Sequence, residues 1–135
     1  MPSFSDRSRA RLETCHPDLV ALFTEVIRHV DCTVLEGVRS DERQAELYRT
    51  GKSKVDGVTT RSQHQVKSDG YSHAVDVAPY PIDWEDAKRF AFFAGYVHAT
   101  ADRLGIKIRW GGDWDGDGNQ REHSFWDAPH YEIAR

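Results

Sequence analysis

The order of hydrophobic patterns along the chain limits the fold more than any other feature of the sequence. Apolar residues recur every three or four positions from Pro17 to Val30 and again over residues 84–104, which predicts two amphipathic helices. Asp83 is expected to cap the second of these helices and Gly105 to end it. The charged segment 6–14 is expected to form a short helix before these two helices. A further short helix is expected to begin at Ser40 or Asp41 and to stop at Gly51.

Four other segments have the alternating or β-branched composition of strands, at residues 32–38, 74–80, 106–110 and 130–134. The elements therefore run helix, helix, strand, helix, strand, helix, strand, strand. This order predicts an α+β fold with a small antiparallel or mixed sheet covered by helices. With 135 residues, the chain has the length of one ordinary domain, so residues 1–135 are expected to fold as a single unit around one core.

Composition argues against several classes of function. The formal net charge is -4 and Lys and Arg form no cluster, whereas nucleic-acid binding needs a basic surface for phosphate contacts. The longest apolar run is far shorter than the ~20 residues of a membrane span. The N-terminal residues also lack the apolar stretch of a secretory signal, so Cys15 and Cys32 are expected to be reduced core residues rather than a disulfide.

The C-terminal segment 127–132 has the strongest functional pattern. Pro129 cannot donate a backbone hydrogen bond and disfavours helix at the residue before it, which predicts a turn at Asp127 and a strand from His130. Alternate side chains of a strand share a face, so His130 and Glu132 are expected on one side and Tyr131 on the other. This arrangement predicts a polar cleft wall backed by the core.

Two residues elsewhere in the chain are candidates to complete this wall. His64 lies in the long irregular segment 51–72, and Asp76 lies between small residues on a predicted strand. Two imidazoles and one carboxylate are typical of catalytic zinc sites, which keep a fourth position for water. A metal lowers the pKa of that water toward ~7, and Asp127 is placed to accept its proton. Arg39, at the end of a predicted strand, could hold an oxyanion or a substrate carboxylate.

Each of these residues alone also fits a structural role. Asp127 fits a turn residue and Arg39 a surface ion pair, and a single histidine is more often structural than a ligand. The spacing by itself therefore leaves open both a metal site and an ordinary polar cleft.

Several motifs, taken together, resemble the zinc D-Ala-D-Ala metallopeptidase family and, within it, the L-alanyl-D-glutamate endopeptidase branch found as bacteriophage endolysins. The similarity covers about residues 19–133. The motifs are Ser62-x-His64, Asp69-Gly70-Tyr71-Ser72-x-Ala74-Val75-Asp76 and Trp126-Asp127-x-x-His130-x-Glu132, with Gly37-Val38-Arg39-Ser40, Gln44, Val77-Ala78-Pro79-Tyr80 and Trp110-Gly111-Gly112-Asp113-Trp114 in support.

The resemblance implies the hedgehog/D,D-peptidase fold, one catalytic zinc ion and hydrolysis of the L-Ala–D-Glu bond in peptidoglycan stem peptides. By position, His64, Asp76 and His130 match the zinc ligands, Asp127 the general base, and Arg39 the oxyanion or substrate contact. The expected protein is a monomeric endolysin. It would accumulate in the cytoplasm of an infected bacterium and reach the cell wall after the membrane is permeabilised, without inserting into it or binding nucleic acid.

The spacing between the first histidine and the aspartate departs from the family pattern. In the family the first His commonly precedes the Asp by seven positions, whereas His64 precedes Asp76 by twelve, and we interpret residues 65–70 as lengthening the loop. The alternative first ligand is His73. On a strand His73 would face away from Asp76, so the prediction favours His64.

An acidic loop after residue 112 has a second, weaker metal pattern. Its alternating oxygen donors imitate the start of a calcium loop, but Ser124 stands where the twelfth-position Glu is expected. Both a calcium site and a solvated acidic loop remain open. The candidate ligands are Asp113, Asp115 and Asp117.

Three other functions compete with the endopeptidase. A D,D-carboxypeptidase or dipeptidase would use the same metal site, because the choice of scissile bond depends on the shape of the cleft. A non-catalytic, zinc-containing cell-wall-binding module would need no base such as Asp127. A metal-dependent nuclease also uses His and Asp, but the acidic balance of the chain disfavours it.

Overall fold

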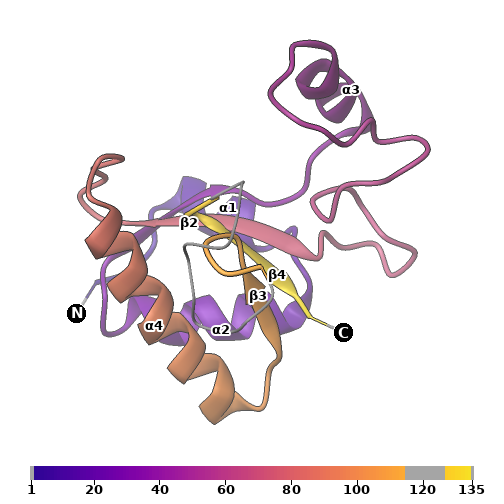
Figure 1. Ribbon diagram of the computed structural model, residues 1–135. Helices are drawn as coiled ribbons and strands as arrows, with labels where there is room; N and C mark the ends of the chain where they lie inside the picture. Colours follow the sequence, from indigo (N-terminus) through magenta and orange to yellow (C-terminus); the bar gives the residue numbers. More distant parts are fainter. Residues whose placement is uncertain (1, 115–126, 135) are drawn as a thin grey trace.

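The computed structural model describes residues 2–114 and 127–134, and its helices and strands follow the predicted order (Figure 1). The predicted α+β class is confirmed. The elements are α1 (Asp6–Leu12), α2 (Pro17–Ile27), β1 (Cys32–Glu36), α3 (Asp41–Arg49), β2 (Ala74–Pro79), α4 (Ala87–Leu104), β3 (Ile108–Trp110) and β4 (His130–Ile133).

The four strands form one sheet in the order β1-β2-β4-β3. All three neighbouring pairs are antiparallel, which decides between the antiparallel and mixed sheets that the sequence allowed. The last strand, β4, lies between β2 and β3 and places His130 directly opposite Asp76. The sheet thereby joins two predicted site residues that are far apart in the sequence.

The two faces of the sheet have different roles. Val75, Val77 and Tyr131 are fully buried on the face that packs against α2 and α4. Asp76 and His130 occupy alternate positions of the same strands, so their side chains lie on the opposite face. The period-two pattern of β2 and β4 therefore separates the hydrophobic core from the polar wall, as the sequence predicts.

The long helix α4 begins later than predicted. The helical pattern was expected to start at residue 84 with Asp83 as its cap, but the cap is Asp86, whose side chain accepts a hydrogen bond from Arg89 N. Asp83 instead accepts from Glu85 N in a short preceding turn. The helix ends as predicted at Gly105, which adopts a left-handed conformation with φ of 73°.

Helix α3 stands apart from the sheet and the other helices (Figure 1). Gln44 is its buried residue, at 0% exposure. The following segment, 50–73, contains neither helix nor strand, in agreement with the irregular loop expected there. Two backbone hydrogen bonds hold this segment close to the ends of β1 and β2. Arg39 N donates to His64 O at 2.8 Å, and His73 N donates to Gln63 O at 2.9 Å. The segment thus positions His64 beside β2.

Cys15 and Cys32 are both buried and unpaired, as expected. Among the described helices, none combines the length and apolar character that a membrane span requires.

Candidate metal centre

Three predicted side chains converge on one point above the polar face of the sheet. Asp76 Oδ1 is 3.2 Å from His64 Nε2 and 3.4 Å from His130 Nδ1. One ligand atom of each residue lies within 4.8 Å of the others, so a single ion could contact all three. Asp76 and His130 are held by the sheet register, whereas His64 comes from the irregular segment.

The orientation of His64 is fixed by the backbone. Its side chain is 2% exposed, and Nδ1 lies 2.8 Å from the carbonyl oxygen of Gly37. A carbonyl oxygen can only accept a hydrogen bond, so Nδ1 carries the ring proton and donates a hydrogen bond to Gly37 O. The neutral ring then presents the lone pair of Nε2 toward Asp76 Oδ1.

His130 is oriented by a carboxylate instead. Its Nε2 lies 2.7 Å from Glu132 Oε1. Glu132 also forms an ion pair with Arg109, in which Oε2 lies 2.7 Å from the guanidinium nitrogen Nη2. Burial lowers the pKa of His130, but hydrogen bonds to Asp76 and Glu132 outweigh it and raise the pKa to about 9. When a metal binds, His130 would lose its Nδ1 proton and keep the Nε2 proton in the hydrogen bond to Glu132, which turns the Nδ1 lone pair toward the ion. Outer carboxylates that hold a metal-binding histidine in this way are common.

A metal ion or a proton at the centre stabilises this arrangement. Two imidazole lone pairs and a carboxylate oxygen repel one another unless a proton or a metal ion lies between them. In a tetrahedral zinc site with bonds of about 2.0–2.2 Å, neighbouring ligand atoms are separated by about 3.3–3.5 Å. The separations of 3.2 and 3.4 Å fit such a site. The donor set is compatible with a divalent metal and leaves its identity open.

Asp127 and Arg39 flank the three donors. Asp127 Oδ2 is 3.9 Å from His130 Nδ1, and burial together with the charge of Asp76 raises the pKa of the Asp127 carboxyl. The Arg39 guanidinium pairs with Glu36 and donates to Gln44 Oε1 at 2.8 Å. Arg39 does form an ion pair, but its side chain is only 12% exposed, so the pair holds the guanidinium in place at the pocket wall.

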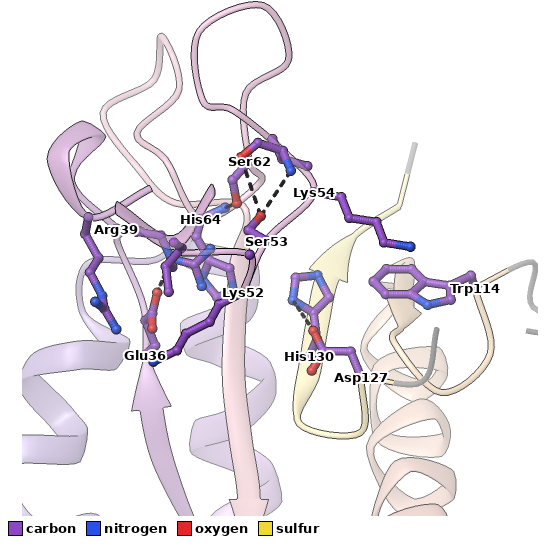
Figure 2. Close-up of a pocket in the computed structure, with 14 residues that line it drawn as sticks. Glu36, Arg39, Lys52, Ser53, Lys54, Ser62, His64, Trp114, Asp127 and His130 are labelled. Carbon is purple, nitrogen blue, oxygen red and sulfur yellow. Dashed lines mark hydrogen bonds and ion pairs between the residues drawn. The ribbon is translucent and has the colours of Figure 1, made fainter. Parts of the chain in front are cut away.

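The site opens into a pocket of about 540 Å³. Figure 2 shows Glu36, Arg39 and His64 on one side of it, and Trp114, Asp127 and His130 on the other. The Trp114 ring lies 5.3 Å from the His130 ring, centroid to centroid. A substrate entering the pocket would meet the metal-compatible donors, a carboxylate and a fixed guanidinium together.

His73, the alternative first ligand, lies in a different cluster. It groups with His16 and Asp69, whereas His64 groups with Asp76 and His130. Of the three candidate ligands in the predicted calcium loop, only Asp113 is among the described residues. Asp115 and Asp117 lie outside the described residues, so that hypothesis is carried by the sequence alone.

Two supporting residues had no role in the sequence-based hypothesis. Glu132 was expected on the same face as His130, but its hydrogen bond to the ring was not. Gln44 was part of the motif set without an assigned function, yet it holds Arg39 from a buried position. The structure identifies this role, because Gln44 is the buried residue of α3 and its polar atoms are all hydrogen-bonded.

Fold and site together define a small α+β protein with a three-donor, metal-compatible centre at the base of a pocket. The model of the phage L-alanyl-D-glutamate peptidase family matches residues 2–134, and the chain belongs to this family.

The chain is similar to proteins from a phage and from two bacteria. The L-alanyl-D-glutamate peptidase of Escherichia phage T5 is 29% identical over 139 residues, which cover 97% of each protein. The peptidoglycan L-alanyl-D-glutamate endopeptidase CwlK of Bacillus subtilis is 27% identical over 115 residues, covering 77% of this chain and 61% of CwlK. The crystal structure of Serratia marcescens L-Ala D-Glu endopeptidase ChiX is similar to the chain, with a TM-score of 0.75 and 32% sequence identity. The match covers 98% of this chain and 91% of the ChiX chain.

Proposed function

We propose that this protein is a zinc-dependent endopeptidase that hydrolyses the L-Ala–D-Glu bond of peptidoglycan stem peptides. The observation that carries the proposal is the convergence of His64 Nε2 and His130 Nδ1 on Asp76 Oδ1, with the second nitrogen of each ring already hydrogen-bonded. The choice of the L-Ala–D-Glu bond as the scissile bond is supported by the names of the similar proteins.

His64, Asp76 and His130 would hold the zinc ion. When bound, zinc supplies a Lewis acid that polarises the scissile carbonyl and lowers the pKa of water at the site toward ~7. The protein contributes the orientation of the donors, because Gly37 O and Glu132 fix the two rings before any metal arrives.

Asp127 is the proposed general base and acid. Its carboxylate lies next to His130, outside the three converging donors, so it remains available for proton transfer. Burial and the nearby Asp76 raise its pKa, and a base with a pKa closer to neutral transfers protons more effectively in both directions. In hydrolysis, the water oxygen bonds to the alanyl carbonyl carbon and the C–N bond breaks. Asp127 takes the proton from water and returns it to the leaving amine of D-Glu.

Arg39 is proposed to bind either the developing oxyanion or a substrate carboxylate. Its charge is permanent, and its contacts with Glu36 and Gln44 hold the side chain at the pocket wall at 12% exposure. Lys52 and Lys54 line the same pocket. These cations suit a stem peptide, whose D-Glu residue carries a free carboxylate beside the scissile bond.

The proposed biological role is that of a phage endolysin. The similarity to the phage T5 peptidase along nearly the whole chain supports this role. The enzyme would act on the cell wall from the host cytoplasm after the membrane has been permeabilised.

Digestion of purified peptidoglycan, with and without a chelator, tests the proposed activity. Mass spectrometry of the products should find new N-terminal D-Glu, which disappears when the chelator removes the metal and returns when zinc is restored. Release of D-Ala would instead identify a carboxypeptidase, and the absence of products would indicate a binding module. Chelator-resistant cleavage would contradict the zinc dependence.

A further inference from the structure

We propose that His16, Asp69 and His73 form a second binding site for a divalent transition-metal ion, separate from the candidate metal centre. One ligand atom from each of these residues lies within 4.8 Å of the others. The cluster has the same composition as the first one, two imidazoles and one carboxylate, which suits zinc and neighbouring first-row ions. None of its members lines the pocket beside Asp127.

The two clusters have similar geometry as well as composition. The ring centroids of His16 and His73 are 5.1 Å apart with an interplanar angle of 79°, and those of His64 and His130 are 5.1 Å apart at 70°. In the second cluster, His73 Nε2 lies 2.7 Å from Asp69 Oδ2. A bound ion would have to separate this close pair by about 0.6–0.8 Å to reach tetrahedral spacing.

The backbone holds the two histidines together without a metal. Cys15 and Ser72 form a parallel bridge, in which His16 N donates to Ser72 O at 2.8 Å and Ser72 N donates to Thr14 O at 3.1 Å. His73 follows directly and is 4% exposed. The site therefore joins the junction between α1 and α2 to the residue that precedes β2, and its histidines are fixed by regular hydrogen bonds.

Asp69 is also oriented for binding. Its Oδ1 accepts a hydrogen bond from Tyr71 N at 3.0 Å, which turns Oδ2 toward His73. The Asp69 side chain is 40% exposed and that of His16 is 28% exposed, so water can reach the cluster and complete the coordination of an ion.

His16 has a second role that metal binding would change. Its Nδ1 accepts from Asp18 N at 3.0 Å and so caps α2. Coordination through Nε2 would place the ring proton on Nδ1, and the Asp18 carboxylate, 3.9 Å away, is the neighbouring acceptor for it. The ion would thus replace a helix cap with a carboxylate–histidine–metal chain.

Two substitutions separate metal binding from folding. His16→Asn removes the imidazole but keeps a side-chain acceptor at the helix cap, where Asn is favoured. Asp69→Asn removes the charge but keeps an oxygen for Tyr71 N. His29→Asn is the matched control, because His29 is half exposed, pairs with Glu25 and belongs to neither cluster. Circular dichroism verifies that each variant is folded.

Zinc content per chain, measured by mass spectrometry of metals after zinc loading and desalting, tests the site. The wild type and His29→Asn should retain one more equivalent than either His16→Asn or Asp69→Asn. His64→Ala should also lose one equivalent, and His16→Asn with His64→Ala should lose two. Cobalt in place of zinc should give visible absorption bands in His64→Ala that vanish when His16→Asn is added.

The activity of each variant keeps this inference distinct from the proposed function. His16→Asn should cleave peptidoglycan at a rate within about twofold of wild type, whereas His64→Ala should not cleave it. If His16→Asn and Asp69→Asn both retain the zinc content of the wild type, the second site does not exist. The zinc counts decide this even if the protein proves to have no peptidase activity.

Discussion

Asp76 and His130 face each other across β2 and β4, and the sheet register alone brings Asp76 Oδ1 to 3.4 Å from His130 Nδ1. Directly opposite residues in an antiparallel pair have Cβ atoms about 4.5–5.5 Å apart, close enough to share one ion. Sites built on strands hold their geometry better than sites on loops. Two of the three proposed ligands are therefore preformed, and His64 depends on its hydrogen bonds with Gly37 O and Arg39 N, which follow β1.

Glu132→Gln should weaken metal binding without removing a ligand. The substitution replaces the carboxylate that accepts from His130 Nε2 with a neutral amide and loses the ion pair with Arg109. Loss of such a partner costs about 10–100-fold in metal affinity. Competition with a chromophoric chelator measures the change. Arg109→Gln, which removes the ion pair but leaves the bond to His130, should have the smaller effect, and equal effects would contradict the argument.

Asp127→Asn should abolish most of the activity while leaving the metal in place. The amide cannot accept the proton that the carboxylate takes from water, and a positioned acid–base group contributes about 10²–10⁴-fold to the rate. We expect kcat to fall by that factor, with zinc content equal to that of the wild type. A variant that loses zinc together with activity would instead identify Asp127 as a ligand.

Gln44→Ala should affect both activity and stability. Gln44 Nε2 donates to Val55 O at 2.6 Å and to Ser53 Oγ at 3.0 Å, while its Oε1 accepts from Arg39. Leaving a buried acceptor unsatisfied costs about 1–3 kcal/mol, so the free energy of unfolding should fall by about that amount in urea titrations. Without this contact Arg39 is less firmly positioned for its proposed role in the pocket, so kcat/KM should also fall.

A control on the same helix is Glu46→Ala. Glu46 pairs with Arg43 at 3.4 Å, and both side chains are half exposed. Such a pair contributes about 0–1 kcal/mol, and the variant should have activity equal to wild type. Equal losses in Gln44→Ala and Glu46→Ala would show that α3 as a whole, and not the buried amide, supports the site.

The sequence predicted the local elements better than their boundaries. Period-3.6 patterns identified α2 and α4, and period-two patterns identified β2 and β4, because each of these elements buries an apolar face. Helix α3, whose buried residue is Gln44, was expected from its caps instead. The start of α4 was wrong because Asp83 and Asp86 are both acceptable caps, and only the turn before the helix decides between them. The strand order could not be obtained in this way, since pairing between β2 and β4 is a long-range choice.

The site was predicted unevenly for a similar reason. Spacing suggested His64, Asp76 and His130, and the family resemblance gave them roles that remain predictions. Strand alternation placed Glu132 on the same face as His130, but it did not indicate the hydrogen bond between them or the one between His64 and Gly37 O. The cluster of His16, Asp69 and His73 was also missed. His16 and His73 are brought close together by the backbone bridge between Cys15 and Ser72, and no sequence pattern predicts that pairing.

Tyr131→Phe should leave the protein equally stable or make it more stable. The Tyr131 ring packs against Phe23 and Phe93 at centroid distances of 5.4 and 6.3 Å, and the side chain is fully buried. Its hydroxyl oxygen has no hydrogen-bond partner among the described residues. Burying an unsatisfied polar group costs about 1–3 kcal/mol, so removing it should raise the free energy of unfolding by about 1 kcal/mol. Urea denaturation measures the change, with the partly exposed Tyr71→Phe expected to stay within about 0.5 kcal/mol of wild type. A loss of stability in Tyr131→Phe would mean that the hydroxyl is hydrogen-bonded in solution.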